Sequence, residues 1–186
     1  MRLAKFYWAF LLLMPLLLFD NALAFETDDY VPEVTARVAR ISFLRGEVQI
    51  KRADSQDWER ATLNLPLVEG DQLTTDRDAR VEIQFDRDSF LRLSENSYLK
   101  IPTLRDEGIA LSLPQGTLSL RVLSFDKDRS YFELDAPQTT VSVQKNGLYR
   151  IDAGDDRSNE VRVTVTDGGE ARVYSDNSGF TLRDGR

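Results

Sequence analysis

The side chains that could carry out acid–base or metal chemistry in this sequence are mainly carboxylates, because the chain contains no histidine and no cysteine. The absence of histidine excludes Ser-His-Asp and Cys-His catalysis. The absence of both residue types removes almost every zinc, copper and iron–sulfur site. Any reaction would have to use carboxylates, lysine, tyrosine, serine or a hard cation.

Two pairs of aspartates have a spacing that could serve calcium binding or acid–base catalysis. Each pair encloses an arginine, in Asp76-Arg-Asp78 and in Asp86-Arg-Asp88. That arginine would partly neutralise a cation site, and aspartates in turns bond to their own backbone. We therefore predict that both pairs are turn residues, and we predict no catalytic residue, no metal site and no cofactor.

A further acidic loop and one lysine offer weaker alternatives. The loop could coordinate calcium through Asp155, Asp156, Asn159 and Glu160. It lacks the alternating ligands and the central glycine of a calcium loop. Lys145 could act as a base if it were buried beside Ser142, but a solvated lysine in a turn is the simpler interpretation.

Trp58 is the residue that we single out as an interface candidate. An exposed tryptophan can stack on a ligand or anchor a protein interface. The structural alternative is that Trp58 caps one end of the domain beside Ala61 and Leu63. Outward positions of the expected strands carry arginines that could form a ladder with neighbouring acids. They are Arg37, Arg40, Arg92, Arg121, Arg150, Arg162 and Arg172.

Short β-strands are the elements that would position these residues. The clearest hairpin pattern has apolar residues at Val81, Ile83 and Phe85, a turn over 86–89, and apolar residues again at Leu91 and Leu93. Such alternation gives each strand one face for a core and one for water. The same pattern predicts a first strand with Ala39, Ile41 and Phe43 on one face, and a late strand with Val161, Val163 and Val165 on one face.

The pattern of the whole chain predicts an all-β domain. About a dozen short strands are separated by turns, and no window outside the leader shows a helical apolar stripe. We predict a single β-sandwich or β-roll. A turn followed by a strand recurs at Gly46, Gly116 and Gly169, so a solenoid-like coil is the alternative, although the spacing is too uneven for a strict repeat.

The N-terminus has the features of a signal peptide. A basic start, Met1–Lys5, precedes an apolar run over Phe6–Phe19, and Ala22-Leu-Ala24 fits a signal peptidase site. The run is shorter than the roughly 20 residues of a membrane span. We predict a signal helix, cleavage after Ala24, no stable membrane insertion afterwards, and a periplasmic or secreted protein. An uncleaved anchor is the alternative.

Composition supports one domain behind that leader. We expect a signal peptide over 1–24, an acidic extended arm over 25–37 and an all-β domain over 38–184. A net charge of −7 and a pI near 4.8 argue against nucleic acid as a partner, because its phosphates would be repelled.

Several motifs, taken in order, resemble the FecR-type domain of bacterial exported and envelope proteins. The matching stretches are Gly46-Glu-Val-x-Ile50, Leu67-x-x-Gly-Asp-x-Leu-x-Thr75, Asp88-Ser-x-Leu-x-Leu93, Leu113-x-x-Gly-x-Leu-x-Leu120, Ala136-Pro137, Gly147 with Tyr149-Arg-Ile151, and Val165-x-Asp-Gly-Gly-Glu-x-x-Val173. Family members often carry Thr-Pro where this chain has Ala136-Pro137, which marks it as a divergent member.

The resemblance implies an all-β, non-catalytic module. In the best-known members this module is the periplasmic part of a regulator that relays a signal across the inner membrane. We therefore expect an exported, non-enzymatic binding module with a protein or cell-envelope partner. A membrane-anchored FecR-type regulator is one alternative, if the leader is retained. A carboxylate-dependent glycan hydrolase is the other, and it needs two acids facing one cleft.

Overall fold

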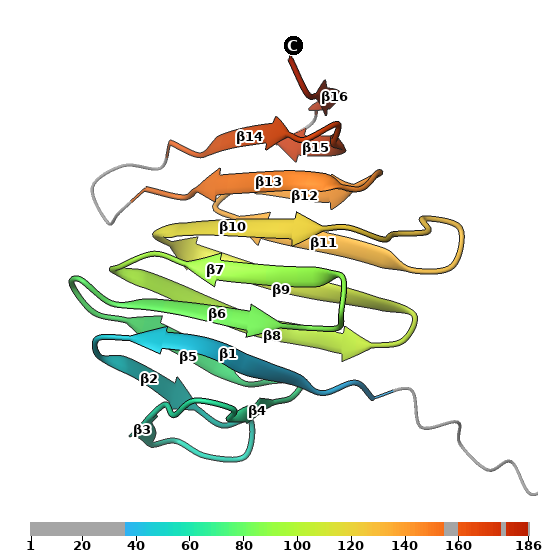
Figure 1. Cartoon of the computed structure of the whole chain (residues 1–186). Helices are drawn as coiled ribbons and strands as arrows, with labels where there is room; N and C mark the ends of the chain where they lie inside the picture. Colours follow the sequence, from blue (N-terminus) through green and yellow to red (C-terminus); the bar gives the residue numbers. More distant parts are fainter. Residues whose placement is uncertain (1–35, 155–159, 176–177, 186) are drawn as a thin grey trace, which may run out of the picture. The chain divides into compact units, whose positions relative to one another are not determined.

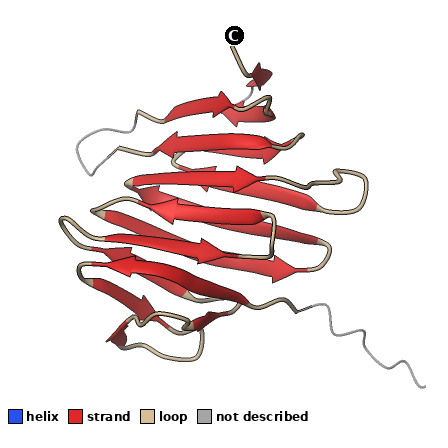
Figure 2. Cartoon of the chain, in the orientation of Figure 1, coloured by secondary structure: helices blue, strands red, loops and turns tan. Residues whose placement is uncertain are grey.

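The described part of the chain folds entirely into β-strands, turns and loops. The computed structural model describes residues 36–154, 160–175 and 178–185. These residues form sixteen strands and no helix (Figure 2), so the prediction of an all-β domain is confirmed. No helix long and apolar enough to span a membrane occurs in those ranges. The predicted signal helix within 1–24 lies outside the described residues, as does the arm up to residue 35.

The strands form two sheets, which lie one behind the other in Figure 1. The seven-stranded sheet contains, in spatial order, β14 (Arg162–Thr166), β13 (Gly147–Asp152), β10 (Thr117–Val122), β7 (Ser89–Leu93), β6 (Arg80–Gln84), β1 (Ala39–Arg45) and β4 (Pro66–Leu67). The nine-stranded sheet contains β16 (Ser178–Arg183), β15 (Glu170–Ser175), β12 (Thr139–Val143), β11 (Tyr131–Ala136), β9 (Gly108–Gln115), β8 (Ser97–Arg105), β5 (Gln72–Thr75), β2 (Val48–Lys51) and β3 (Trp58–Arg60).

Strand order in both sheets follows the chain, except that β4 and β3 lie at the edges beyond β1 and β2. The chain passes repeatedly from one sheet to the other, so successive segments extend both layers. Neither sheet closes on itself among the described residues. Within them, pairing is antiparallel except between β9 and β11, which run parallel. The strands exceed the predicted dozen partly because β3 and β4, with three and two residues, are too short to show alternation.

The hydrophobic core lies between the two sheets and is built by the predicted alternation. In the β6–β7 hairpin, Val81 pairs with Leu93 and Ile83 with Leu91, and all four side chains are buried. The nine-stranded sheet contributes buried residues such as Leu111 to the same cluster. The prediction of a hairpin with one buried apolar face is therefore confirmed, although Ser89, which we placed in the turn, begins β7 and is buried.

The first strand departs from the predicted alternation. Ala39 and Ile41 are buried as expected, but Phe43 is 49% exposed. The register of β1 against β6 shifts between Ile41 and Phe43, which marks a β-bulge. Because of this shift, Leu44 packs against the core and Phe43 points outward. The prediction that Phe43 belongs to the core is wrong for this reason.

A buried carboxylate fixes the turn between β4 and β5. Asp71 has 0% exposure and accepts hydrogen bonds from Arg52 Nη1 at 3.0 Å and from the backbone N–H groups of Val68 at 3.0 Å and Ala53 at 3.2 Å. A buried charge needs such partners because desolvation is costly. Asp71 thus joins the β2–β3 and β4–β5 connections.

Candidate functional site: the arginine face

The outer surface of the seven-stranded sheet is organised in rows of side chains across the strands. Since Val81, Leu91, Leu120 and Tyr149 are buried, their sequence neighbours face outward. Strand register then aligns one outward row of residues from six strands. This row is Phe43, Glu82, Arg92, Ser119, Arg150 and Thr164.

Arginines dominate this outer surface. We define the arginine face as the outward arginines of the seven-stranded sheet: Arg40, Arg45, Arg80, Arg92, Arg121, Arg150 and Arg162. The acids at outward positions of the same strands are Glu82 and Asp152. The chain as a whole carries a net charge of −7, so this face opposes the overall charge of the molecule.

Several arginines of the face form the predicted ladder with acids. Arg92 Nε lies 2.7 Å from Glu82 Oε2 on the neighbouring strand. Arg150 bonds Asp152 through Nε at 3.1 Å and Nη2 at 2.7 Å. Arg121 lies 3.5 Å from Asp167. Exposed pairs of this kind contribute only about 0–1 kcal/mol each, so the ladder orients side chains more than it stabilises the fold.

The environment of Asp152 lowers the pKa of its carboxyl group. Partial burial of the carboxyl group raises its pKa and is the largest single influence on it. Hydrogen bonds from Arg150 and from the Thr117 hydroxyl, at 2.7 Å to Asp152 Oδ1, together outweigh it. Asp152 therefore stays ionised below the usual aspartate range and continues to neutralise Arg150 there.

Arg45 and Arg80 differ from these paired arginines. They lie directly opposite each other on β1 and β6, and both are exposed. No acidic side chain in the described ranges forms an ion pair with either one. Like charges directly opposite on neighbouring strands are unfavourable. Sequence analysis missed both residues, because their opposition depends on the register between distant strands.

A hollow of about 540 Å³ opens beside this pair. It is lined by Phe43, Arg45, Arg80, Arg92, Ser119 and Arg150, among others. Guanidinium groups present several N–H donors in a fixed planar fork and do not lose their charge in proteins. The hollow therefore offers anion-binding donors next to one exposed aromatic ring.

The predicted interface residue, Trp58, lies elsewhere. It is on β3, the edge strand of the nine-stranded sheet, and its exposure is 41%. Its ring contacts Tyr98 edge to face, with 6.2 Å between the ring centres. Ala61 is buried, whereas Leu63 is 58% exposed. Trp58 thus packs partly on the outer surface of its sheet and is not part of the arginine face.

Both predicted aspartate pairs lie in turns. Asp76 Oδ1 accepts a hydrogen bond from the Arg77 backbone N–H at 2.7 Å, and Asp86 Oδ1 accepts one from the Asp88 N–H at 2.7 Å. Asp86 also forms an ion pair with Arg37 at 3.1 Å. Arg37 lies outside the strands, so the prediction that it occupies an outward strand position is wrong. These contacts agree with the interpretation of the pairs as turn residues.

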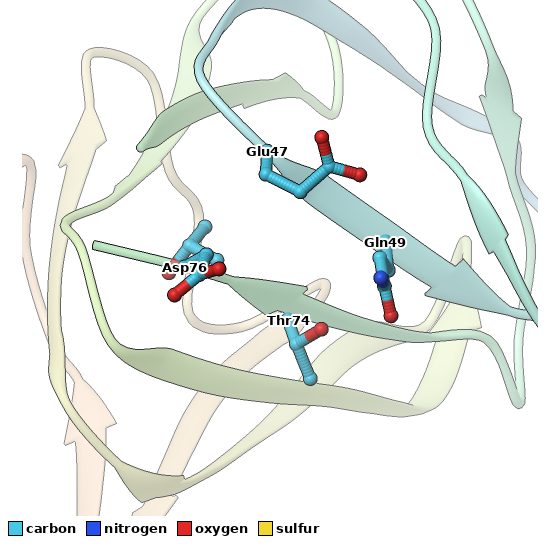
Figure 3. A pocket seen from close by; sticks show the side chains of 5 residues that line it. Glu47, Gln49, Thr74 and Asp76 are labelled. Carbon is cyan, nitrogen blue, oxygen red and sulfur yellow. The ribbon is translucent and has the colours of Figure 1, made fainter. Parts of the chain in front are cut away.

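A second hollow, of about 230 Å³, is lined by two acids, Glu47 and Asp76, and by Gln49, Thr74 and Thr75. Figure 3 shows the side chains that line it. Glu47 pairs with Arg60 at 3.6 Å. Within the described ranges, no group of three or more acids, histidines or cysteines is placed to hold a metal ion. The hollow is therefore a polar surface depression with its glutamate already paired.

The remaining candidates do not converge on one site. Lys145 Nζ lies 2.7 Å from Glu170 Oε2 and is 62% exposed, which fits a solvated turn lysine. Contacts with Lys145 and then Arg183 lower the pKa of Glu170. Asp155, Asp156 and Asn159 lie outside the described residues, and Glu160 lies 3.7 Å from Arg162.

Comparison with known families decides where this β-fold belongs. The family described as FecR protein matches residues 71–169, more than half of the chain. The chain belongs to the FecR family. No curated protein and no solved structure matches it.

The FecR match covers part of the arginine face. Arg80, Arg92, Arg121, Arg150 and Arg162 lie within the matched residues. Phe43 and Arg45 precede them, on β1. The hollow therefore combines strands of the matched FecR region with a strand that lies before it in the chain.

Proposed function

We propose that this FecR-family protein is an exported, non-catalytic binding module, and that its arginine face contacts an acidic partner in the cell envelope. Family membership supports a regulatory, signalling or binding role in general. The leader sequence supports export, with cleavage after Ala24.

One observation carries this proposal. The outward arginines of the seven-stranded sheet outnumber the outward acids on a chain with a net charge of −7. A surface patch whose charge is opposite in sign to the net charge of the molecule attracts and orients partners of complementary charge. The −7 charge also weakens any attraction to nucleic acid, which favours a locally acidic partner over a uniformly charged polymer.

The chemistry of the arginine face favours binding over catalysis. Arginine guanidinium groups hold anions, but they do not act as general bases or nucleophiles at ordinary pH. The two described aspartate pairs bond to their own turns, which argues against the carboxylate-dependent hydrolase. The membrane-anchored regulator remains the alternative if the leader is retained, and Trp58 is proposed as a secondary contact.

The experiment has two parts. N-terminal sequencing of the exported protein should give Phe25 as the first residue, and an intact leader would favour the anchored regulator. Retention of the mature protein on an isolated envelope fraction should then fall at least about tenfold in Arg45→Glu/Arg80→Glu.

Arg172→Glu is the matched control, because Arg172 is an exposed arginine on the outer surface of the nine-stranded sheet and pairs in register with Ser142. Retention that is equal in all variants would overturn the proposal. Circular dichroism of each variant verifies that the β-fold is intact.

A further inference from the structure

The Arg45–Arg80 pair is held by the backbone around it. Gly46, which follows Arg45, has φ +78°, and a Cβ atom built there would lie 2.8 Å from Ala79 Cα. Ala79 precedes Arg80, so the close contact of Gly46 with Ala79 brings the two strand ends together. The two arginines project from neighbouring strands, where opposite Cβ atoms are about 4.5–5.5 Å apart.

Folding alone gives no reason for this pair. The other arginines of the hollow have carboxylate partners, at 2.7 Å for Arg92 with Glu82 and at 2.7 Å for Arg150 with Asp152. Arg45 and Arg80 have none in the described part of the chain, and they repel each other. A carboxylate between them would accept hydrogen bonds from both guanidinium groups and remove the repulsion.

Phe43 adds an apolar contact next to the pair. The bulge in β1 directs its ring outward, where it is 49% exposed and lines the same hollow as Arg45 and Arg80. A large exposed aromatic side chain that borders paired charges is typical of a protein contact site.

We infer that Arg45 and Arg80 clamp a carboxylate of an acidic polypeptide segment, and that Phe43 contacts an apolar side chain beside that carboxylate. This inference rests on the proposed function and specifies its partner and its contact residues. The clamp binds glutamate or aspartate by forked hydrogen bonds, as arginine does in other carboxylate sites.

The arrangement of charges selects a polypeptide over a uniformly charged polymer. Glu82 and Asp152 interrupt the arginines of the hollow and its border. Because these acids neutralise Arg92 and Arg150, the arginines of the hollow without an acidic partner among the described residues are Arg45 and Arg80. A ligand with a negative charge at every position, such as polyphosphate or a surface of anionic lipid, would place most of its charges where no unpaired cation is available. A peptide can place its acids at the clamp and neutral residues at Glu82 and Asp152.

The test uses calorimetric titration of the mature protein with synthetic ten-residue peptides. One peptide has a central Glu-Leu-Glu in a Gly/Ser background, and the second has Glu-Ser-Glu. Inorganic polyphosphate and vesicles containing phosphatidylglycerol are the other ligands. We expect the Glu-Leu-Glu peptide to bind more tightly than polyphosphate of equal charge and more tightly than the vesicles.

Three variants identify the contacts. Arg45→Ala/Arg80→Ala should weaken binding of the Glu-Leu-Glu peptide at least about tenfold, whereas Arg172→Ala should leave it unchanged. Phe43→Ser should weaken binding of the Glu-Leu-Glu peptide several-fold more than that of the Glu-Ser-Glu peptide. Circular dichroism confirms that each variant is folded.

Tighter binding of polyphosphate or vesicles would overturn the inference, as would an equal effect of Phe43→Ser on both peptides. If the peptides do not bind but retention on the envelope fraction still depends on Arg45 and Arg80, this inference is overturned and the proposed function is not. Loss of that dependence in the envelope experiment would overturn the proposed function as well.

Discussion

The two outer surfaces of this protein differ although both sheets are built on the same alternation. On the nine-stranded sheet, one row across the strands consists of Trp58, Lys51, Gln72, Lys100, Ser112, Asp135, Thr140 and Tyr174. We call this row the mixed face. Within this row, Thr140 Oγ1 donates a 2.6 Å hydrogen bond to Asp135, and Gln72 accepts a hydrogen bond from the hydroxyl of Tyr98, which lies beside the row.

On the arginine face, one pair of side chains has no such partners. Arg45 and Arg80 face each other with no acidic partner among the described residues, whereas Arg92 and Arg150 are paired. On the mixed face, Lys51 and Lys100 also lack an acidic partner among the described residues, but Gln72 lies between them. The difference between the two surfaces is therefore a pair of like charges that lie directly opposite each other on the arginine face. It also locates the proposed contact at the β1–β6 end of the face.

The largest expected effect concerns the backbone contact that supports the unpaired arginines. Gly46→Ala should lower the free energy of unfolding by about 2–4 kcal/mol, because it adds a steric clash to a left-handed backbone conformation. The φ of Gly46 is +78°, and the added Cβ would meet Ala79 Cα at 2.8 Å. Denaturant unfolding measures the change.

Gly168→Ala is the matched control for that substitution. Gly168 has a similar φ of +77°, but a Cβ there would have no heavy atom within 4 Å. We expect a loss of only about 1 kcal/mol, from the backbone conformation alone. Equal losses at both glycines would contradict the role of the contact with Ala79.

The second prediction uses salt to distinguish the two faces. Raising NaCl from about 50 to 300 mM should weaken binding of the acidic partner roughly tenfold, because exposed charges are screened over a shorter distance. Arg45→Ala/Arg80→Ala should show a clearly flatter dependence on salt, and Arg172→Ala should behave like the wild type. Parallel salt dependences for all three proteins would place the contact elsewhere.

The third prediction concerns pH on the arginine face. Because the folded-state pKa of Asp152 is lowered, its stabilising effect is present above the unfolded value of about 3.8 and is lost as the pH falls through the folded pKa. Asp152→Asn should therefore cost up to about 1 kcal/mol at pH 6 and less at pH 2, where the carboxyl group is closer to its protonated form. Thermal unfolding at both pH values measures this, and a constant difference would contradict the assignment.

The smallest effect comes from building an arginine pair on the other sheet. Ser142 lies opposite Arg172 on the outer surface of the nine-stranded sheet, so Ser142→Arg creates a like-charged pair there. We expect a loss of about 0.2–1 kcal/mol in unfolding free energy. Denaturant unfolding measures this loss. An unchanged unfolding free energy would contradict the repulsion that we assign to arginines opposite each other on neighbouring strands.

The sequence predicted those features that depend on local alternation. The β6–β7 hairpin follows from the spacing of Val81, Ile83, Leu91 and Leu93, and it is confirmed. Phe43 breaks the rule, because a bulge moves it to the outer surface, and a bulge leaves no clear mark in a short apolar pattern.

The late strand shows a second limit of local patterns. Val165 is buried, but Val163 is only partly buried and Val161 precedes the strand. β14 is the last strand of its sheet, so it has a neighbour on one side only. The same alternation therefore gives different burial at the edge and in the middle of a sheet.

The candidate site was beyond prediction from the sequence for a related reason. Arg45 and Arg80 are 35 positions apart, and only the register of β1 against β6 places them opposite each other. The outward arginines on β7, β10 and β13 were predictable, because each lies between apolar residues that are buried. Trp58 was predicted as an interface residue because of its residue type, and it lies on the other sheet.

Site-specific photo-crosslinking tests the central claim most directly. A photoreactive amino acid replaces Ser119 in the hollow of the arginine face or, as the matched control, Ser112 on the mixed face. In an isolated envelope fraction, we predict an adduct from position 119 that disappears in high salt, and none from position 112. An adduct from position 112 alone would contradict the account.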